Sequence, residues 1–245
     1  MEVHHHSHSS RKKWTHYFWE FLMLFLAVFC GFYAEYQLEH KIEKDRERQY
    51  IKSLLEDLHE DTIALAQTIK EFEGHLKRND TLIKLLTAAN IKEYGADLYY
   101  LGRRASRSVR LALHDFTIQQ MKGSGGFRLI RNQRVSKAII EYYNRTVFIE
   151  YLNDIESGES DEYRKMATEV FHPVIFNGIV KPDNIVTRPD DNPTLLTYDT
   201  KVLLRLAGMV SYIRNTKLGL MNAESEMKAA AIDLIQLIKK EYHLK

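Results

Sequence analysis

Two Glu-x-x-His pairs are the residues whose types and spacing come nearest to a catalytic metal set. Glu56 and His59 form one pair, and Glu169 and His172 form the other. Residues at i and i+3 share a helix face, and two such pairs in a four-helix bundle supply ligands to a di-iron centre. Those ligands must point into the bundle. Leu58 belongs to the apolar face of the same helix, so Glu56 and His59 cannot both lie centrally. A di-iron or other metal enzyme is therefore the weakest functional hypothesis.

The other motifs that could do chemistry are also incomplete. The glycine-rich segment 123–126 could cradle a phosphate, but the lysine that a P-loop requires after its second glycine is missing. We predict an inter-helix turn there, because glycine adopts positive φ readily. Cys30 is the only cysteine, which excludes an internal disulfide and a cysteine-based zinc site. We find no Ser-His-Asp or Cys-His arrangement, and so we predict a non-enzymatic protein without a cofactor or metal.

A basic region is the strongest electrostatic feature. Residues 92–137 contain ten basic and three acidic side chains, whereas residues 141–199 contain twelve acidic and five basic ones. One interpretation is a binding surface for an anionic ligand, a lipid headgroup or an acidic partner. The alternative is that the basic and acidic elements pack together, or that the charges are simply solvated. The candidate anion- or partner-binding residues are Arg103, Arg107, Arg110, Arg128, Arg131 and Arg134.

These arginines must be positioned by helices. A helix predicted from about Ser106 to Met121 would place Arg103, Arg107 and Arg110 on one face, counting back into the preceding turn. Beyond the glycine turn, a helix from about Asn132 would bring Arg131 and Arg134 together. The pattern between residues 91 and 101 is ambiguous.

The longest periodic pattern begins at Ile51. Apolar residues recur there at alternating steps of three and four over five heptads, which predicts a helix with a coiled-coil-like seam ending near residues 88–90. The seam consists of Ile51, Leu55, Leu58, Leu65, Ile69, Phe72, Leu76, Ile83 and Leu86, with Thr62 and Asn79 in the same register.

The rest of the chain also reads as helices, each with one apolar face. The helix from Asn132 continues to about Glu156, where residues 157–160 could kink or interrupt it. All four prolines lie in residues 173–198, so we predict that 174–198 is an irregular loop. A last helical region runs from about Asp199 to Tyr242. We therefore predict an all-α fold, in which residues 36–245 form an antiparallel helical bundle.

Residues 14–35 predict a transmembrane anchor that precedes this bundle. Tyr17 to Ala34 is long enough to cross the hydrocarbon and carries one charge, Glu20. Neither a signal-peptidase site nor a lipobox fits its end, so we expect an uncleaved helix that runs without a breaker into the seam helix. Glu20 is a candidate intramembrane contact, or it reaches the interface from one turn inside the span. Residues 1–13, basic and His-rich, are predicted to be a disordered tail.

Charges beside the span suggest its orientation. Residues 11–13 are all basic, which favours a cytoplasmic N-terminus, although four basic residues also occur within 41–48 on the other side. We expect a single-pass membrane protein with an extracytoplasmic C-terminal domain. The net charge of +2 gives no sign of nucleic-acid binding.

Residues 114–144 carry a resemblance to a known family. Gly126, Leu129, Ile130, Asn132, Val135, Ile139, Tyr142 and Tyr143 match its pattern, as do Glu20 and the Leu/Asp-rich run at residues 54–58. The chain resembles an uncharacterised family of small single-pass membrane proteins common in Bacteroidota. The Ala34-Glu35-Tyr36 end of the span departs from the Asn-Trp pattern of that family. The resemblance implies this architecture and a place in a bacterial inner membrane, with the C-terminal domain in the periplasm, and it implies no chemistry.

The leading hypothesis is a membrane-anchored, non-enzymatic module for protein–protein interaction or an accessory subunit of a membrane complex. Its partners would be the bilayer and another protein, or a second copy paired through the seam. The alternative is an extracytoplasmic, sensor-like domain that binds an anionic ligand at the basic region.

Overall fold

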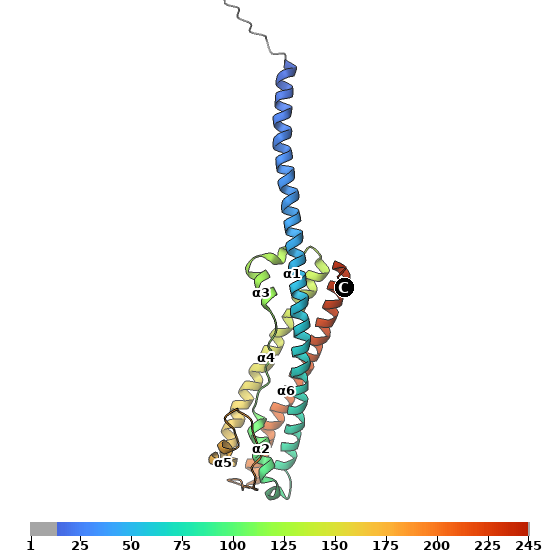
Figure 1. Cartoon of the computed structure of the whole chain (residues 1–245). Helices are drawn as coiled ribbons and strands as arrows, with labels where there is room; N and C mark the ends of the chain where they lie inside the picture. The colour runs from blue at the N-terminus through green and yellow to red at the C-terminus, as the bar shows by residue number, and fades with distance from the viewer. Residues whose placement is uncertain (1–13, 245) are drawn as a thin grey trace, which may run out of the picture. The chain divides into compact units, whose positions relative to one another are not determined.

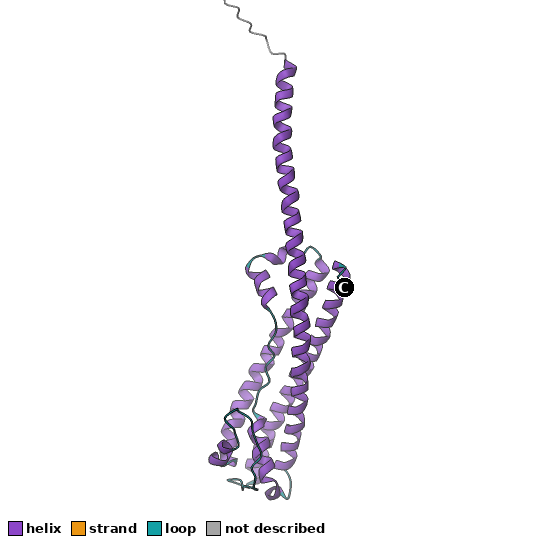
Figure 2. Ribbon diagram, in the orientation of Figure 1, coloured by secondary structure: helices purple, strands orange, loops and turns teal. Residues whose placement is uncertain are grey.

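The computed structural model describes residues 14–244, and it confirms the all-α prediction (Figures 1 and 2). This range contains six α-helices, two 3-10 helices and no β-strand. The predicted disordered tail, residues 1–13, lies outside the described residues. In chain order the elements are α1 (Trp14–Leu86), η1 (Ile91–Tyr94), α2 (Gly95–Ala105), α3 (Phe116–Gly123), η2 (Gly126–Leu129), α4 (Gln133–Val170), α5 (Pro173–Gly178) and α6 (Thr200–Tyr242).

The chain divides into two compact units, Met1–Tyr50 and Ile51–Lys245. Helix α1 passes from the first unit into the second without a break, as the lack of glycine and proline between residues 33 and 73 predicts. The second unit begins at the residue where the predicted seam begins.

In the first unit, α1 exposes nearly all its large apolar side chains. Phe21, Phe25, Phe29 and Tyr33 stack at i, i+4 spacing along one face, with ring centroids 6.1 to 6.4 Å apart. By length and composition α1 could span a membrane, and it is the one described helix that meets this test. An apolar surface of this kind needs lipid or protein around it.

In the second unit, α1, α4 and α6 pack side by side (Figure 1). The Thr68 hydroxyl hydrogen bonds to Glu224, and Asp80 accepts from Arg214 Nε at 2.9 Å, so α1 and α6 are antiparallel. Tyr142 bonds Asp61 near the start of the unit, and the C-terminal turns of α1 and α4 share the core cluster at its other end. Helices α1 and α4 are therefore parallel, because α2 and an extended segment return the chain between them.

Three residues of the predicted seam are not fully buried on α1. Asp61, Thr68 and Leu82 are buried, whereas the neighbouring Thr62, Ile69 and Ile83 are only partly buried. Asp61 and Thr68 tolerate burial because each hydrogen bonds to a side chain of another helix. The seam side chains pack inside this chain's own bundle.

The predicted helix from Ser106 to Met121 is wrong. Helix α2 ends at Ala105, residues 107–114 form an extended connection outside any helix or strand (Figure 1), and helical structure resumes at Phe116. Side chains of α1 hold the end of this connection and the start of α3: the Asp61 carboxylate accepts from the His114 amide at 2.7 Å, and Asp57 accepts from the Thr117 amide at 3.0 Å. Arg103, Arg107 and Arg110 therefore do not share a helix face.

Helix α4 begins as predicted and runs further. The Asn132 side chain accepts from the amides of residues 134 and 135, which caps the helix. No interruption occurs at residues 157–160, where Gly158 is exposed. Ser160 donates to the buried Glu156 carboxylate at 3.1 Å, so these polar residues serve an internal contact within a continuous helix.

The proline-rich region is irregular apart from the short helix α5, and it is packed onto the bundle. The Asn192 side chain donates to the Lys92 carbonyl and accepts from the Ala96 amide. The Tyr99 hydroxyl donates to the Thr194 carbonyl at 3.1 Å. This loop closes the end of the bundle that carries α2 and α5 (Figure 1).

Candidate functional site

Three arginines surround one polar pocket at the end of the bundle that carries α2 and α5. Arg103 lies in the last turn of α2, Arg107 in the extended segment, and Arg164 in α4. The pocket has a volume of about 360 Å³. Ser106, Ser108 and Asn184 complete its lining. Guanidinium groups and hydroxyls arranged in this way suit an anion with several acceptor oxygens.

Two of these guanidinium groups lack a carboxylate partner. Within residues 14–244, no acidic side chain lies within 4 Å of the charged nitrogens of Arg103 or Arg107. Arg107 donates to the carbonyl and to the side-chain oxygen of Asn184, both at 2.9 Å. Arg164 pairs with Asp161 on its own helix and donates to the Ser106 carbonyl at 3.1 Å.

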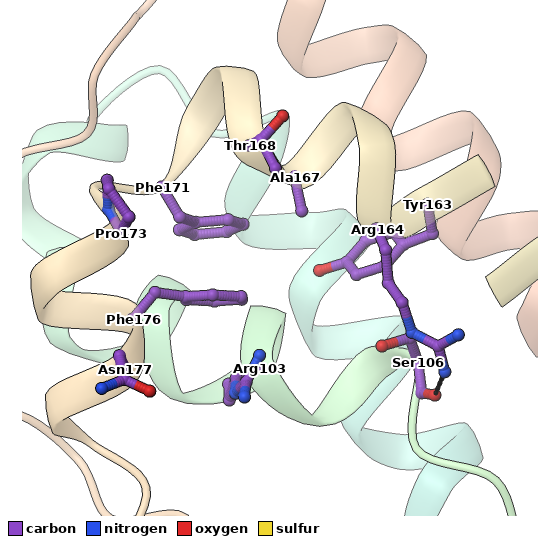
Figure 3. A pocket seen from close by; sticks show the side chains of 10 residues that line it. All are labelled: Arg103, Ser106, Tyr163, Arg164, Ala167, Thr168, Phe171, Pro173, Phe176 and Asn177. Atoms are coloured by element: carbon purple, nitrogen blue, oxygen red, sulfur yellow. Dashed lines mark hydrogen bonds between the residues drawn. The ribbon is translucent and has the colours of Figure 1, made fainter. Parts of the chain in front are cut away.

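A second, apolar pocket adjoins the first (Figure 3). Its volume is about 370 Å³, and it shares Arg103, Ser106 and Arg164 with the polar pocket. Figure 3 shows the Phe171 and Phe176 rings lying parallel, with Tyr163 and Arg164 on the opposite side of the pocket; the two ring centroids are 4.8 Å apart. The remaining lining residues are Ala167, Thr168, Pro173 and Asn177.

The Arg103 guanidinium links the two pockets. Its central carbon lies 5.0 Å from the centroid of the Phe176 ring, in a cation–π contact that holds the charge at the boundary. The Tyr163 hydroxyl donates to the Gly102 carbonyl at 2.7 Å, which fixes the end of α2 that carries Arg103.

A buried ion pair positions Arg107. Lys217 of α6 and Glu156 of α4 are almost completely buried, with Nζ 3.4 Å from Oε1. Lys217 Nζ also donates to the main-chain carbonyl of Arg107 at 2.6 Å, and Ser108 donates to Glu156 at 2.8 Å. If α2 continued, its own amides would bond the main-chain carbonyls of Ser106 and Arg107. Instead Arg164 of α4 and Lys217 of α6 bond these two carbonyls.

The cations near this end of the bundle repel one another. Burial lowers the pKa of Arg107, and its neighbours Arg104 and Arg103 lower it further. Burial also lowers the pKa of His75 to about 3, with Lys217 as the next largest cause. The smaller, electrostatic part of each shift comes from neighbouring cations, and a bound anion would reduce that repulsion.

The other predicted arginines lie elsewhere. Arg110 bonds Asn153 and faces Glu156, with Nη1 3.6 Å from Oε2. Arg134 pairs with Glu241 at 3.1 Å. Arg128 lies in η2, and Arg131 precedes α4, so with Arg134 they belong to the end of the bundle opposite α2 and α5 (Figure 1). The six candidates therefore do not form one site.

The Glu-x-x-His residues do not reach the bundle interior. Glu56, His59 and Glu169 are exposed. His172 is also exposed, and its Nδ1 accepts from the Val174 amide at 3.3 Å to cap α5. Within residues 14–244 no three His, Cys, Asp or Glu side chains are grouped so as to hold a metal ion.

Glu20 lies in the first unit. Its carboxylate is 3.1 Å from His16 Nε2, one turn earlier on α1, and both side chains are about half exposed. This contact is local to the helix.

Sequence reasoning missed Arg164 and Lys217. Arg164 lies in the acidic stretch, where its charge is outnumbered, and Lys217 interrupts the apolar face of α6 at a fully buried position. The sequence did contain a signal for Lys217, because this lysine lies in helical register with Ile213 and Leu220, which are both on the buried face of α6.

The chain matches no known protein-family model, no curated protein and no solved structure. The geometry of the two pockets therefore carries the functional argument by itself.

Proposed function

We propose that this protein is a membrane-anchored, non-enzymatic helical bundle that binds an anionic ligand in the manner of a sensor domain. The observation that carries the proposal is the meeting of Arg103, Arg107 and Arg164 around one polar pocket. Two of the three have no carboxylate partner within the described chain, so their charge is free to meet a ligand. A pocket with few convergent polar groups is the expected form of a small-ligand site.

Inorganic phosphate and sulfate test this proposal. The full chain in detergent micelles should melt at higher temperature as either anion is added at constant ionic strength, because binding to the native state adds stability. Arg107→Ala and Arg103→Ala should each abolish most of the shift. Arg134→Ala is the matched control, since it removes the same charge at the other end of the bundle. A shift that survives both pocket variants, or no shift at all, would overturn the proposal.

A second candidate function is docking of a partner protein, and the surface of α4 favours it. Ile140, Val147, Phe148 and Tyr151 are all exposed on α4 at helical spacing, and the last two rings lie 6.4 Å apart. Crosslinking and mass measurement in detergent, with Phe148→Ser as the variant, test this role. A strict monomer that captures no other protein would count against it.

The cellular placement is also a proposal. A span at α1 supports a single-pass protein, and the basic residues 11–13 support a cytoplasmic N-terminus with the bundle in the periplasm of a bacterial inner membrane. The family resemblance around residues 126–143 agrees with this placement. Protease added to intact spheroplasts should digest the bundle. If the bundle is protected from protease until the membrane is broken, the opposite orientation is indicated.

A further inference from the structure

We propose that the ligand is an amphipathic anion, with its charged group among Arg103, Arg107 and Arg164 and an aryl or short acyl group beside Phe171 and Phe176. This inference rests on the proposed function and specifies the chemistry of its ligand.

The continuity of the two pockets supports a single ligand. Arg103, Ser106 and Arg164 line both of them, so a molecule held at the polar pocket borders the apolar one directly. If the ligand were a purely inorganic anion, only water would fill the aromatic pocket, and contact between water and apolar side chains is unfavourable.

The apolar pocket has the room and the lining for a hydrocarbon group. Tyr163, Ala167, Phe171, Pro173 and Phe176 supply carbon surface on several sides. Its volume of about 370 Å³ exceeds the roughly 150 Å³ of an apolar cavity known to accept a benzene molecule. An aromatic ring or a short acyl chain therefore fits beside the stacked phenylalanines.

The arginines around the polar pocket require the other end of the ligand to be negatively charged. The Arg103 guanidinium lies at the boundary over Phe176, and Arg107 faces the polar pocket from the extended segment. A cation would be repelled there, and a neutral hydrocarbon would leave Arg103 and Arg107 without an anionic partner. An anion attached to an apolar group meets both requirements.

The test compares matched probes on the full chain in detergent-free nanodiscs of phosphatidylcholine. Inorganic phosphate is compared with phenyl phosphate, acetate with benzoate, and phenol serves as the uncharged control. Because the ring would be buried, each aryl anion should bind about tenfold more tightly than its small counterpart, and phenol should not bind measurably.

Variants separate the two halves of the ligand. Phe176→Ala, on the short helix α5, should remove the advantage of the aryl anions, measured as the ratio of phenyl phosphate to phosphate affinity in the same variant. Thr168→Phe, from an exposed position on α4, should do the same by filling the pocket. Arg107→Ala should weaken all anions alike. Melting curves of each variant without ligand show whether the bundle remains folded.

The outcomes distinguish this inference from the proposed function. Equal affinity for phosphate and phenyl phosphate, and for acetate and benzoate, would overturn the amphipathic ligand and leave anion binding intact. Binding of none of these anions would overturn both proposals. An aryl advantage that persists in both Phe176→Ala and Thr168→Phe would also overturn the inference.

The same measurement identifies the source of the ligand. If the ligand is a membrane lipid, phosphatidic acid added to the nanodiscs should compete with phenyl phosphate. Competition supports the proposal and identifies the amphipathic anion as a lipid headgroup with its acyl chain. If the affinity for phenyl phosphate does not change, the result supports a water-soluble amphipathic anion.

Discussion

Lys217 of α6 donates a hydrogen bond to the main-chain oxygen of Arg107 across 2.6 Å, from a side chain that solvent does not reach. The same ammonium group forms an ion pair with Glu156 of α4. One buried charge therefore connects two long helices to the extended segment that carries Arg107. This relationship links the stability of the bundle to the shape of the candidate site.

Removing that charge should be strongly destabilising. Lys217→Met leaves the buried Glu156 with only the half-exposed Arg110 as a cation nearby, and we expect a loss of about 3 to 5 kcal/mol in the free energy of unfolding. The double variant Lys217→Met/Glu156→Leu should recover part of the loss, because no unpaired buried charge remains. Urea unfolding followed by circular dichroism measures both. A single variant as stable as the parent chain would show that the pair does not hold the segment.

Neighbouring tyrosines of α4 offer a matched comparison. The Tyr142 hydroxyl donates to the buried carboxylate of Asp61 at 2.7 Å, whereas the buried Tyr143 hydroxyl has no hydrogen-bond partner among residues 14–244. Burial already raises the pKa of Asp61, and Tyr142 partly offsets that effect. Tyr142→Phe should therefore lower stability by about 1.5 to 3 kcal/mol, as expected for a bond to a charged group.

Tyr143→Phe should be neutral or slightly stabilising, since it removes an unsatisfied buried hydroxyl. Chemical denaturation of the two variants side by side makes the comparison. Equal losses in both would contradict the assignment of the Asp61 contact.

Glu224 should make stability depend on pH. Burial raises its pKa from 4.5 to about 7, although a hydrogen bond from Thr68 opposes the shift. The folded chain therefore holds this proton more tightly than the unfolded chain. Its contribution is fully present below about pH 4.5 and is lost as the pH rises through about 7.

The size of this effect should be on the order of 1 to 3 kcal/mol. His75 acts in the opposite sense, because its pKa is lowered to about 3 and its contribution is lost as the pH falls below 6.5. The informative quantity is the difference between the parent chain and Glu224→Gln at each pH. Glu226→Gln, at an exposed position of the same helix, is the control. Parallel pH profiles for the parent and Glu224→Gln would exclude a coupled proton at this site.

Two glycines should respond in opposite directions to alanine. A Cβ atom on Gly95 would lie 2.1 Å from the Pro193 carbonyl oxygen, so Gly95→Ala must displace the proline-rich loop. Gly158 is exposed within α4 and has open space around the Cβ position. Gly158→Ala should therefore raise stability by about 0.5 to 1 kcal/mol, because alanine favours the helix.

Gly95→Ala should lower stability and expose the loop to limited proteolysis. Thermal melting and cleavage rates measure the two effects. A loop equally resistant to protease in Gly95→Ala would show that the close approach at Pro193 is not required.

Local patterns predicted most of the helices. The three-and-four spacing from Ile51, the helix starts near Asn132 and Asp199 and the clustered prolines are short-range signals, and each depends on the backbone and its nearest neighbours. In the structure Asn132 and Asp199 both cap their helices, since each side chain accepts from main-chain amides of the first turn. The apolar residues 17–34 likewise indicate a candidate span by length and composition alone.

The candidate site could be predicted only in part. Arg103 and Arg107 were identified from the charge of their region, but their grouping with Arg110 on one helix face was wrong. Arg164 comes from a stretch whose net charge is negative, and local charge says nothing about which helix will lie beside it.

By itself, then, the sequence determined an all-α chain, an apolar N-terminal helix and a region rich in arginine. The tertiary structure decided where the helix ends before Arg107 and which arginines meet. The physical reason is that carbonyl groups at residues 105 and 107 are satisfied by Lys217, more than a hundred residues away in the chain. A helix forms where its own backbone bonds are the best available, and here a buried ammonium group from α6 supplied better ones.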